Sequence, residues 1–211
     1  MKKYSLVVLF CLFSVFCAGQ GSEGCCSRPS FSIMPSLGVV MSLFYGPGAH
    51  NESARVGVNA GAELGYMFNK KVGCALGVFY TQQGSIASRI SYDLISRLDY
   101  VNFPLLLNVR VSKVVTFKAG FQLGVLANAK FRDSTGEIMP DDMKPKDMFK
   151  GVDCSLPIGV SCQFGKIVIE SRMNYGLLNI VKSSSSIYSI PYLDNGKVHN
   201  FFLSTSIGYI M

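Results

Sequence analysis

Two histidines and a pair of adjacent aspartates are the side chains in this sequence that could perform acid–base chemistry. His199 would have to meet the Asp141–Asp142 pair to form a hydrolytic site, and His50 is a second candidate base. Neither histidine is accompanied by the serine and carboxylate pattern of a nucleophilic site. Single histidines in polar segments are usually solvated. We therefore predict that the chain is not an enzyme.

Metal and cofactor chemistry is equally poorly supported by the sequence. Asp141, Asp142 and Asp147 could bind a divalent cation, but Lys144 and Lys146 lie between them and would repel it. Five cysteines follow the N-terminal segment without the spacing of a metal site: Cys25, Cys26, Cys74, Cys154 and Cys162. Three of them fall within predicted strands, where packing explains them. We predict no metal and no cofactor.

Five charged residues share one face of segments in which polar and apolar residues alternate: Glu63, Arg110, Lys118, Glu170 and Arg172. In a narrow barrel this face would line the interior, where charges must pair. We predict a buried network of these two acids and three bases. Four amides are expected to supply hydrogen bonds: Asn59, Asn108, Gln122 and Asn174. The network has two interpretations, a structural plug or the gate of a narrow ion path.

The elements that position these charges follow from period-two alternation, which is typical of strands. It recurs in eight segments: 36–45, 55–68, 71–83, 101–111, 115–125, 152–164, 167–178 and 200–209. Three connections are tight and four are long, the long ones covering 46–54, 86–97, 130–149 and 180–198. Short turns at one end and long loops at the other predict an all-β fold, an eight-stranded antiparallel up-and-down transmembrane β-barrel.

The composition of the two faces decides which one points outward. One face carries Val, Leu and aromatic residues, and the other carries Gly, Ser and Asn. Small side chains suit the narrow interior of an eight-stranded barrel, whereas bare glycines facing water would weaken the strands. A soluble ligand-binding barrel, such as a lipid carrier, is the alternative with the faces reversed. The mean hydropathy of +0.31, without an apolar run long enough for a helical span, favours the membrane barrel.

The N-terminus has the pattern of a secretory signal peptide. Lys2 and Lys3 precede an uncharged stretch over residues 4–16, and small residues follow it. We predict a signal peptide over 1–19, a periplasmic segment over 20–32 and a barrel domain over 33–211. The net charge of +7 falls by two without Lys2 and Lys3. It is dispersed, so we expect no nucleic-acid partner.

The second half of the chain resembles the outer-membrane β-barrel domain of PorT-like proteins from the Bacteroidota. The resemblance is carried by residues 100–110, 118–130 and 169–180 and by a closing strand that ends at Tyr209. It implies an eight-stranded barrel in the cell outer membrane without a periplasmic domain. The chain departs from the usual pattern because it ends in Met211 instead of an aromatic residue.

Two functions are consistent with this architecture. The first is a structural or interaction role, as part of an envelope or secretion assembly; one namesake in the family belongs to a secretion apparatus. Loop 130–149 and the serine-rich loop at Ser183–Ser186 would then be the surfaces that contact an envelope protein partner. The alternative is a small passive channel, which requires a continuous water path through the interior.

Overall fold

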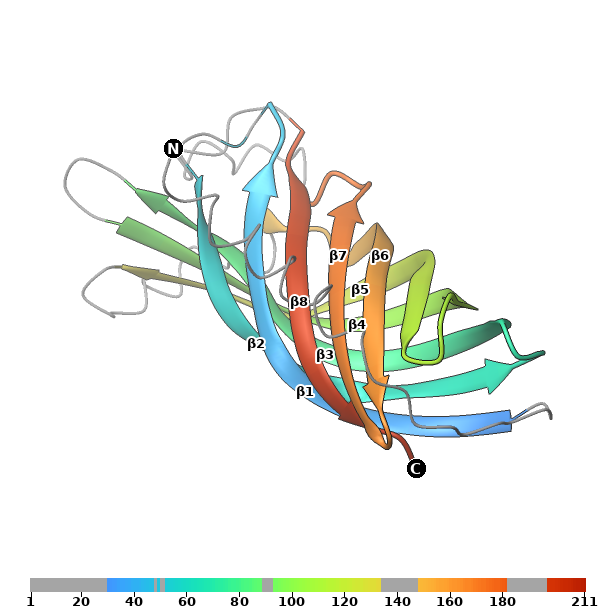
Figure 1. Ribbon diagram of the computed structural model, residues 1–211. Helices are drawn as coiled ribbons and strands as arrows, with labels where there is room; N and C mark the ends of the chain where they lie inside the picture. The colour runs from blue at the N-terminus through green and yellow to red at the C-terminus, as the bar shows by residue number, and fades with distance from the viewer. Residues whose placement is uncertain (1–29, 48, 50–51, 89–92, 134–147, 182–196) are drawn as a thin grey trace, which may run out of the picture.

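The computed structural model describes residues 30–47, 49, 52–88, 93–133, 148–181 and 197–211. It has eight strands: β1 Ser30–Tyr45, β2 Glu52–Met67, β3 Val72–Ser88, β4 Asp93–Arg110, β5 Val115–Asp133, β6 Val152–Phe164, β7 Ile167–Gly176 and β8 His199–Tyr209. Each strand pairs antiparallel with the next, and β1 pairs with β8 to close the barrel (Figure 1). The predicted eight-stranded up-and-down topology is confirmed.

Several predictions concern residues outside this description. They are the signal peptide over 1–19, most of the segment over 20–32 with Cys25 and Cys26, the candidate residues His50, Asp141, Asp142 and Asp147, most of loop 130–149, and the serine-rich loop at Ser183–Ser186. Within the described part, β1 begins at Ser30, three residues before the expected start of the barrel. No helix in the described ranges is long and apolar enough to cross a membrane.

Local side-chain hydrogen bonds and one glycine shape the three tight turns. In the β2–β3 turn, Asn69 Oδ1 accepts hydrogen bonds from the backbone N–H groups of Lys71 and Val72, both at 2.8 Å. In the β4–β5 turn, Ser112 Oγ accepts from two backbone N–H groups in the same way. The β6–β7 turn contains Gly165 at φ 61°, a left-handed conformation that glycine adopts without a Cβ penalty. Asn, Ser and Gly therefore end the strands where the sequence indicated.

The strands extend further toward the long loops than the sequence predicted. β3 continues to Ser88 and β4 begins at Asp93, so the expected loop over 86–97 is mostly strand. Gly84 has a φ of 135°, and the β4–β5 register shifts between Asp99 and Tyr100. These irregularities interrupt the alternation of side chains while backbone pairing continues, so the sequence pattern fades before the strands end.

The two faces of the barrel are arranged as predicted. Side chains of the apolar face point outward, and the exposed fractions of Val58, Leu76, Leu105 and Leu123 are 46%, 52%, 56% and 55%. They do not meet in a central core. The interior instead holds buried polar side chains, including Asn59, Gln122 and Asn174, among glycines and serines. A continuous apolar belt therefore surrounds a polar interior.

Candidate functional site in the barrel interior

Four charged side chains from three strands meet inside the barrel. Glu63 comes from β2, Lys118 from β5, and Glu170 and Arg172 from β7. All four face inward because each belongs to the polar set of its alternating strand. Each has an exposed fraction of 6% or less. Strands that are not neighbours in the sheet thus contribute one shared cluster, which we call the lumen network.

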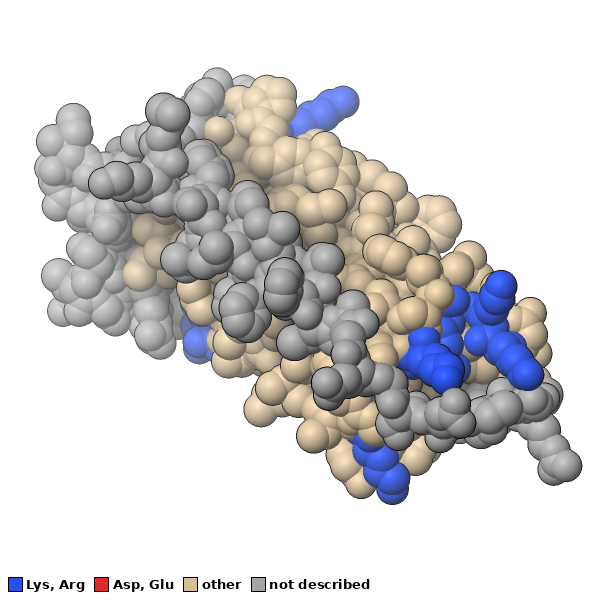
Figure 2. Space-filling model, in the orientation of Figure 1, with Lys and Arg blue, Asp and Glu red and all other residues tan. Residues whose placement is uncertain are grey.

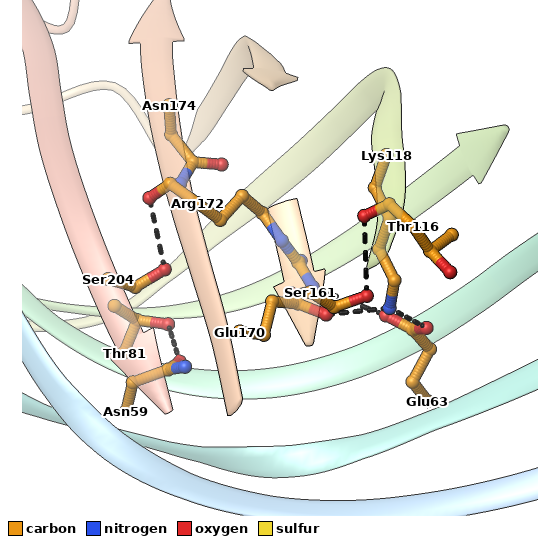
Figure 3. A network of polar contacts seen from close by, with 10 residues as sticks. All are labelled: Asn59, Glu63, Thr81, Thr116, Lys118, Ser161, Glu170, Arg172, Asn174 and Ser204. Carbon is orange, nitrogen blue, oxygen red and sulfur yellow. Dashed lines mark hydrogen bonds and ion pairs between the residues drawn. The ribbon is translucent and has the colours of Figure 1, made fainter. Parts of the chain in front are cut away.

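In the lumen network each base contacts both acids (Figure 3). Lys118 Nζ lies 2.5 Å from Glu63 Oε1 and 2.6 Å from Glu170 Oε2. Arg172 Nη2 lies 3.2 Å from Glu63 Oε2 and also contacts Glu170 Oε1. The guanidinium of Arg172 is 5.3 Å from the ring centroid of Phe79, a cation–π distance. The four charges cancel, which is the condition for holding ions in a dry interior.

Small residues on neighbouring strands make room for these long side chains. Gly159 of β6 is the register partner of both Lys118 on β5 and Arg172 on β7. A Cβ at Gly159 would lie 3.2 Å from the Arg172 Cα. Glu63 is opposite Gly77. The glycines on the inner face therefore create the space that the ion pairs cross.

Arg110, the fifth residue expected in the network, lies apart from it. It is the last residue of β4, half-buried at the short-turn end. None of the ion pairs found among the described residues includes it. The sequence placed it on the correct face but too deep, because the strand ends where water can solvate the guanidinium.

The four amides expected to serve the network are buried, and three of them bond elsewhere. Thr81 Oγ1 donates to Asn59 Oδ1 at 2.9 Å, and Gln122 Nε2 donates to a serine hydroxyl. Asn174 Nδ2 donates to the backbone carbonyl of Arg172. Within the described residues, Asn108 Oδ1 is buried without a partner. The carboxylates are therefore held by the two bases, and the amides support the surrounding backbone and hydroxyls.

An apolar cluster that was not predicted from the sequence fills the barrel interior toward the long loops. Twelve buried apolar residues form one cluster there: Phe44, Ala87, Leu98, Tyr100, Leu126, Ala129, Phe131, Met148, Phe149, Ile180, Val181 and Val198. Phe149 pairs with Val181 in an isolated bridge and packs on the rings of Phe44 and Phe131 at 6.2 and 6.1 Å. Met148-Phe149 and Ile180-Val181 are apolar pairs at the ends of otherwise polar loops. The contrast between these apolar pairs and their polar loops was the sequence signal that could have predicted the cluster.

The remaining candidates form no reactive arrangement in the described part of the chain. The ring of His199 stacks on Tyr45 at 5.3 Å at the loop end of the barrel. Nearby, Asp153 is buried and accepts hydrogen bonds from Asn200 Nδ2 and the backbone of Cys154. Among the described residues, no three His, Cys, Asp or Glu side chains group as metal ligands.

Comparison with protein families agrees with this architecture. The family model described as outer membrane protein beta-barrel domain matches residues 27–182. Among solved structures, Ail of Yersinia pestis in complex with the heparin analogue sucrose octasulfate is 19% identical, with a TM-score of 0.45, covering 86% of this chain and 99% of that one. OprG of Pseudomonas aeruginosa is 12% identical, with a TM-score of 0.41, covering 88% and 97%. Likenesses at this level say nothing about a ligand. No curated protein matches the chain.

Proposed function

Because the chain belongs to the outer membrane β-barrel domain family, with its apolar belt in the lipid of the cell outer membrane, we propose that it is a plugged barrel that acts by interaction. In this proposal it conducts nothing and catalyses nothing. It presents its loop end to a partner in an envelope or secretion assembly. The observation that carries the proposal is the lumen network, in which Glu63, Lys118, Glu170 and Arg172 pair across the interior.

The lumen network argues against conduction on physical grounds. A channel needs a continuous file of water, and charged residues that line one stay partly solvated. Here the charged side chains are buried, and Lys118 and Arg172 donate hydrogen bonds to the two carboxylates. The apolar cluster fills the interior at the loop end as well. Two successive layers of different chemistry oppose the passage of ions.

Planar-bilayer recording tests this proposal. We expect near-zero current from the wild-type barrel and from the near-isosteric variant Glu170→Gln, because the plug depends on packing as well as charge. A wild-type conductance would support the passive channel instead. A current that appears only in Glu170→Gln would support a gate.

The finer assignments belong to the same proposal. We propose membership of the PorT-like group, removal of residues 1–19 as a signal peptide on export, and a periplasmic segment over 20–32. Intact-mass measurement of the protein from outer membranes tests the processing, since cleavage after Gly19 gives one defined N-terminus. The partner is tested by photo-crosslinking in intact cells from Lys150 and Lys197, two exposed residues at the loop end, with Lys70 at the opposite end as the control. A single envelope protein captured from the loop end alone would support the interaction role.

A further inference from the structure

The tight turns of the barrel carry several exposed positive charges. Lys70 and Lys71 lie in the β2–β3 turn and Lys166 in the β6–β7 turn, all exposed; we call them the turn lysines. Arg110 and Lys113 add positive charge at the β4–β5 turn. Figure 2 shows blue side chains gathered at the end where the short turns lie, with no red ones among the described residues that are visible.

Among the described residues, no acidic side chain lies on the surface to compensate the turn lysines. The acidic side chains that the structure describes are all buried: Glu63, Asp99, Asp153 and Glu170. Glu63 and Glu170 are already neutralised by Lys118 and Arg172 in the lumen network. No described carboxylate forms an ion pair with a turn lysine. The short-turn end therefore presents a positive surface, and in outer-membrane barrels this end faces the periplasm.

The depth of the turn lysines is fixed by their neighbours in sequence. Phe68, 53% exposed on the outside, precedes Lys70 by two residues, and Phe164 precedes Lys166 by the same spacing. The Lys166 Nζ lies 5.6 Å from the ring centroid of the outward-facing Tyr209. Aromatic rings of this kind mark the level of lipid headgroups. The ammonium groups thus lie in the tight turns just beyond the apolar belt, and the Lys166 side chain extends toward the belt.

We propose that the turn lysines form a binding surface for the phosphate groups of anionic phospholipids in the periplasmic leaflet. The surface is continuous with the lipid-facing belt, so a lipid whose chains lie along the belt already places its headgroup beside the lysines. An acidic protein partner would instead approach along the barrel axis, away from Tyr209. This inference rests on the outer-membrane location and is independent of whether the lumen conducts.

The chain offers a matched pair of variants for the test. Lys70→Gln/Lys71→Gln/Lys166→Gln removes three charges at the turn end. Lys130→Gln/Lys150→Gln/Lys197→Gln removes three exposed charges at the loop end. The folded full-length barrel in neutral detergent is offered micelles with equal amounts of phosphatidylglycerol and phosphatidylcholine, and the lipid retained after gel filtration is counted.

We expect the wild type and the loop-end variant to retain phosphatidylglycerol in preference to phosphatidylcholine. One basic residue near an anionic surface contributes roughly fivefold to binding, so the turn-end variant should lose between about tenfold and about 100-fold of that preference. Equal loss in both variants, or no loss in the turn-end variant, overturns the proposal. If the turn-end variant does not fold, the salt dependence of lipid binding by the wild type still tests the proposal. Its preference must fall between about 0.1 M and about 1 M salt, where the Debye length shrinks from about 10 to about 3 Å, and a preference unchanged by salt overturns the proposal.

Discussion

Replacing Lys118 by methionine should destabilise the barrel far more than removing any exposed lysine. Lys118 Nζ contacts both carboxylates of the lumen network, at 2.5 and 2.6 Å. Methionine keeps most of the side-chain volume and removes the charge. Arg172 would then face Glu63 and Glu170 alone, which leaves one buried negative charge uncompensated.

The magnitude follows from the burial of the network. Removing one partner of a buried ion pair typically costs about 3–5 kcal/mol, because the remaining charge has lost both water and its counter-ion. With Lys118 only 6% exposed, solvent offers little screening. We expect the free energy of unfolding to fall by about 3–5 kcal/mol. Restoring neutrality in Lys118→Met/Glu63→Gln should recover part of this loss, so the double variant should lose less than the sum of the singles.

The assay is urea unfolding of the barrel in phospholipid vesicles, followed by the change in secondary structure. Lys130→Met is the matched control, since Lys130 lies on the same strand but is exposed. Its effect should stay within about 0.5 kcal/mol. A loss below about 1 kcal/mol in Lys118→Met, or strict additivity in the double variant, would refute the argument that the network is dry and mutually neutralised.

Three further substitutions test other parts of the structure by the same unfolding measurement. Gly159→Ala should lower the free energy of unfolding by about 1–3 kcal/mol, because the added Cβ overpacks against the β7 backbone. In the control Gly151→Ala the added Cβ meets nothing within 4 Å, so the change should stay within about 0.5 kcal/mol. Equal effects would contradict the packing argument. Leu105→Arg at the middle of the apolar belt should cost about 2–4 kcal/mol and Phe31→Arg at its edge about 0–1 kcal/mol, so a reversed order would show that the belt is misplaced. Phe149→Ala should remove about 3–5 kcal/mol, and a neutral result would mean that the loop-end cluster contributes no core.

The alternation of residues was sufficient to predict the barrel and the direction of its faces. In β3 and β4, for example, Leu76 and Leu105 are opposite each other and both point outward. The prediction succeeds because a pleated strand has two faces and the two media, lipid and a packed polar interior, demand opposite side chains. A one-residue error in register would have reversed every assignment.

The partners within the interior were harder to predict than its lining. Alternation gives the face of Glu63, Lys118, Glu170 and Arg172, but their meeting depends on the closure of non-adjacent strands and on the length of each side chain. The same pattern places Arg110 on the inner face although it remains at the rim. Depth along the barrel axis depends on where each turn lies, and period-two alternation carries no information about that.

The loop-end cluster was missed because the pattern reverses along the strands. In β5, Val125 points outward and Gln122 inward, as the membrane pattern requires. Further along β5 the order is inverted, since Leu126 and Phe131 are buried inside while Lys130 is exposed. β4 shows the same inversion, with Arg97 more exposed than the fully buried Leu98. The pattern of apolar residues outside and polar residues inside, which applies in lipid, fails where the strands extend into water.

This inversion is expected where the strands leave the outer side of the bilayer. Val101 and Val125 are register partners on the outward face, and beyond them Arg97 on β4 and Lys130 on β5 are more exposed than their buried apolar neighbours. Beyond them the barrel is surrounded by water, so the hydrophobic effect requires an apolar interior, as in a soluble protein. Below them lipid already satisfies the apolar side chains, and the interior is free to hold ions that pair with one another. The polar plug and the apolar cluster therefore have one physical cause: the same strands are surrounded by lipid along one part of their length and by water along the other.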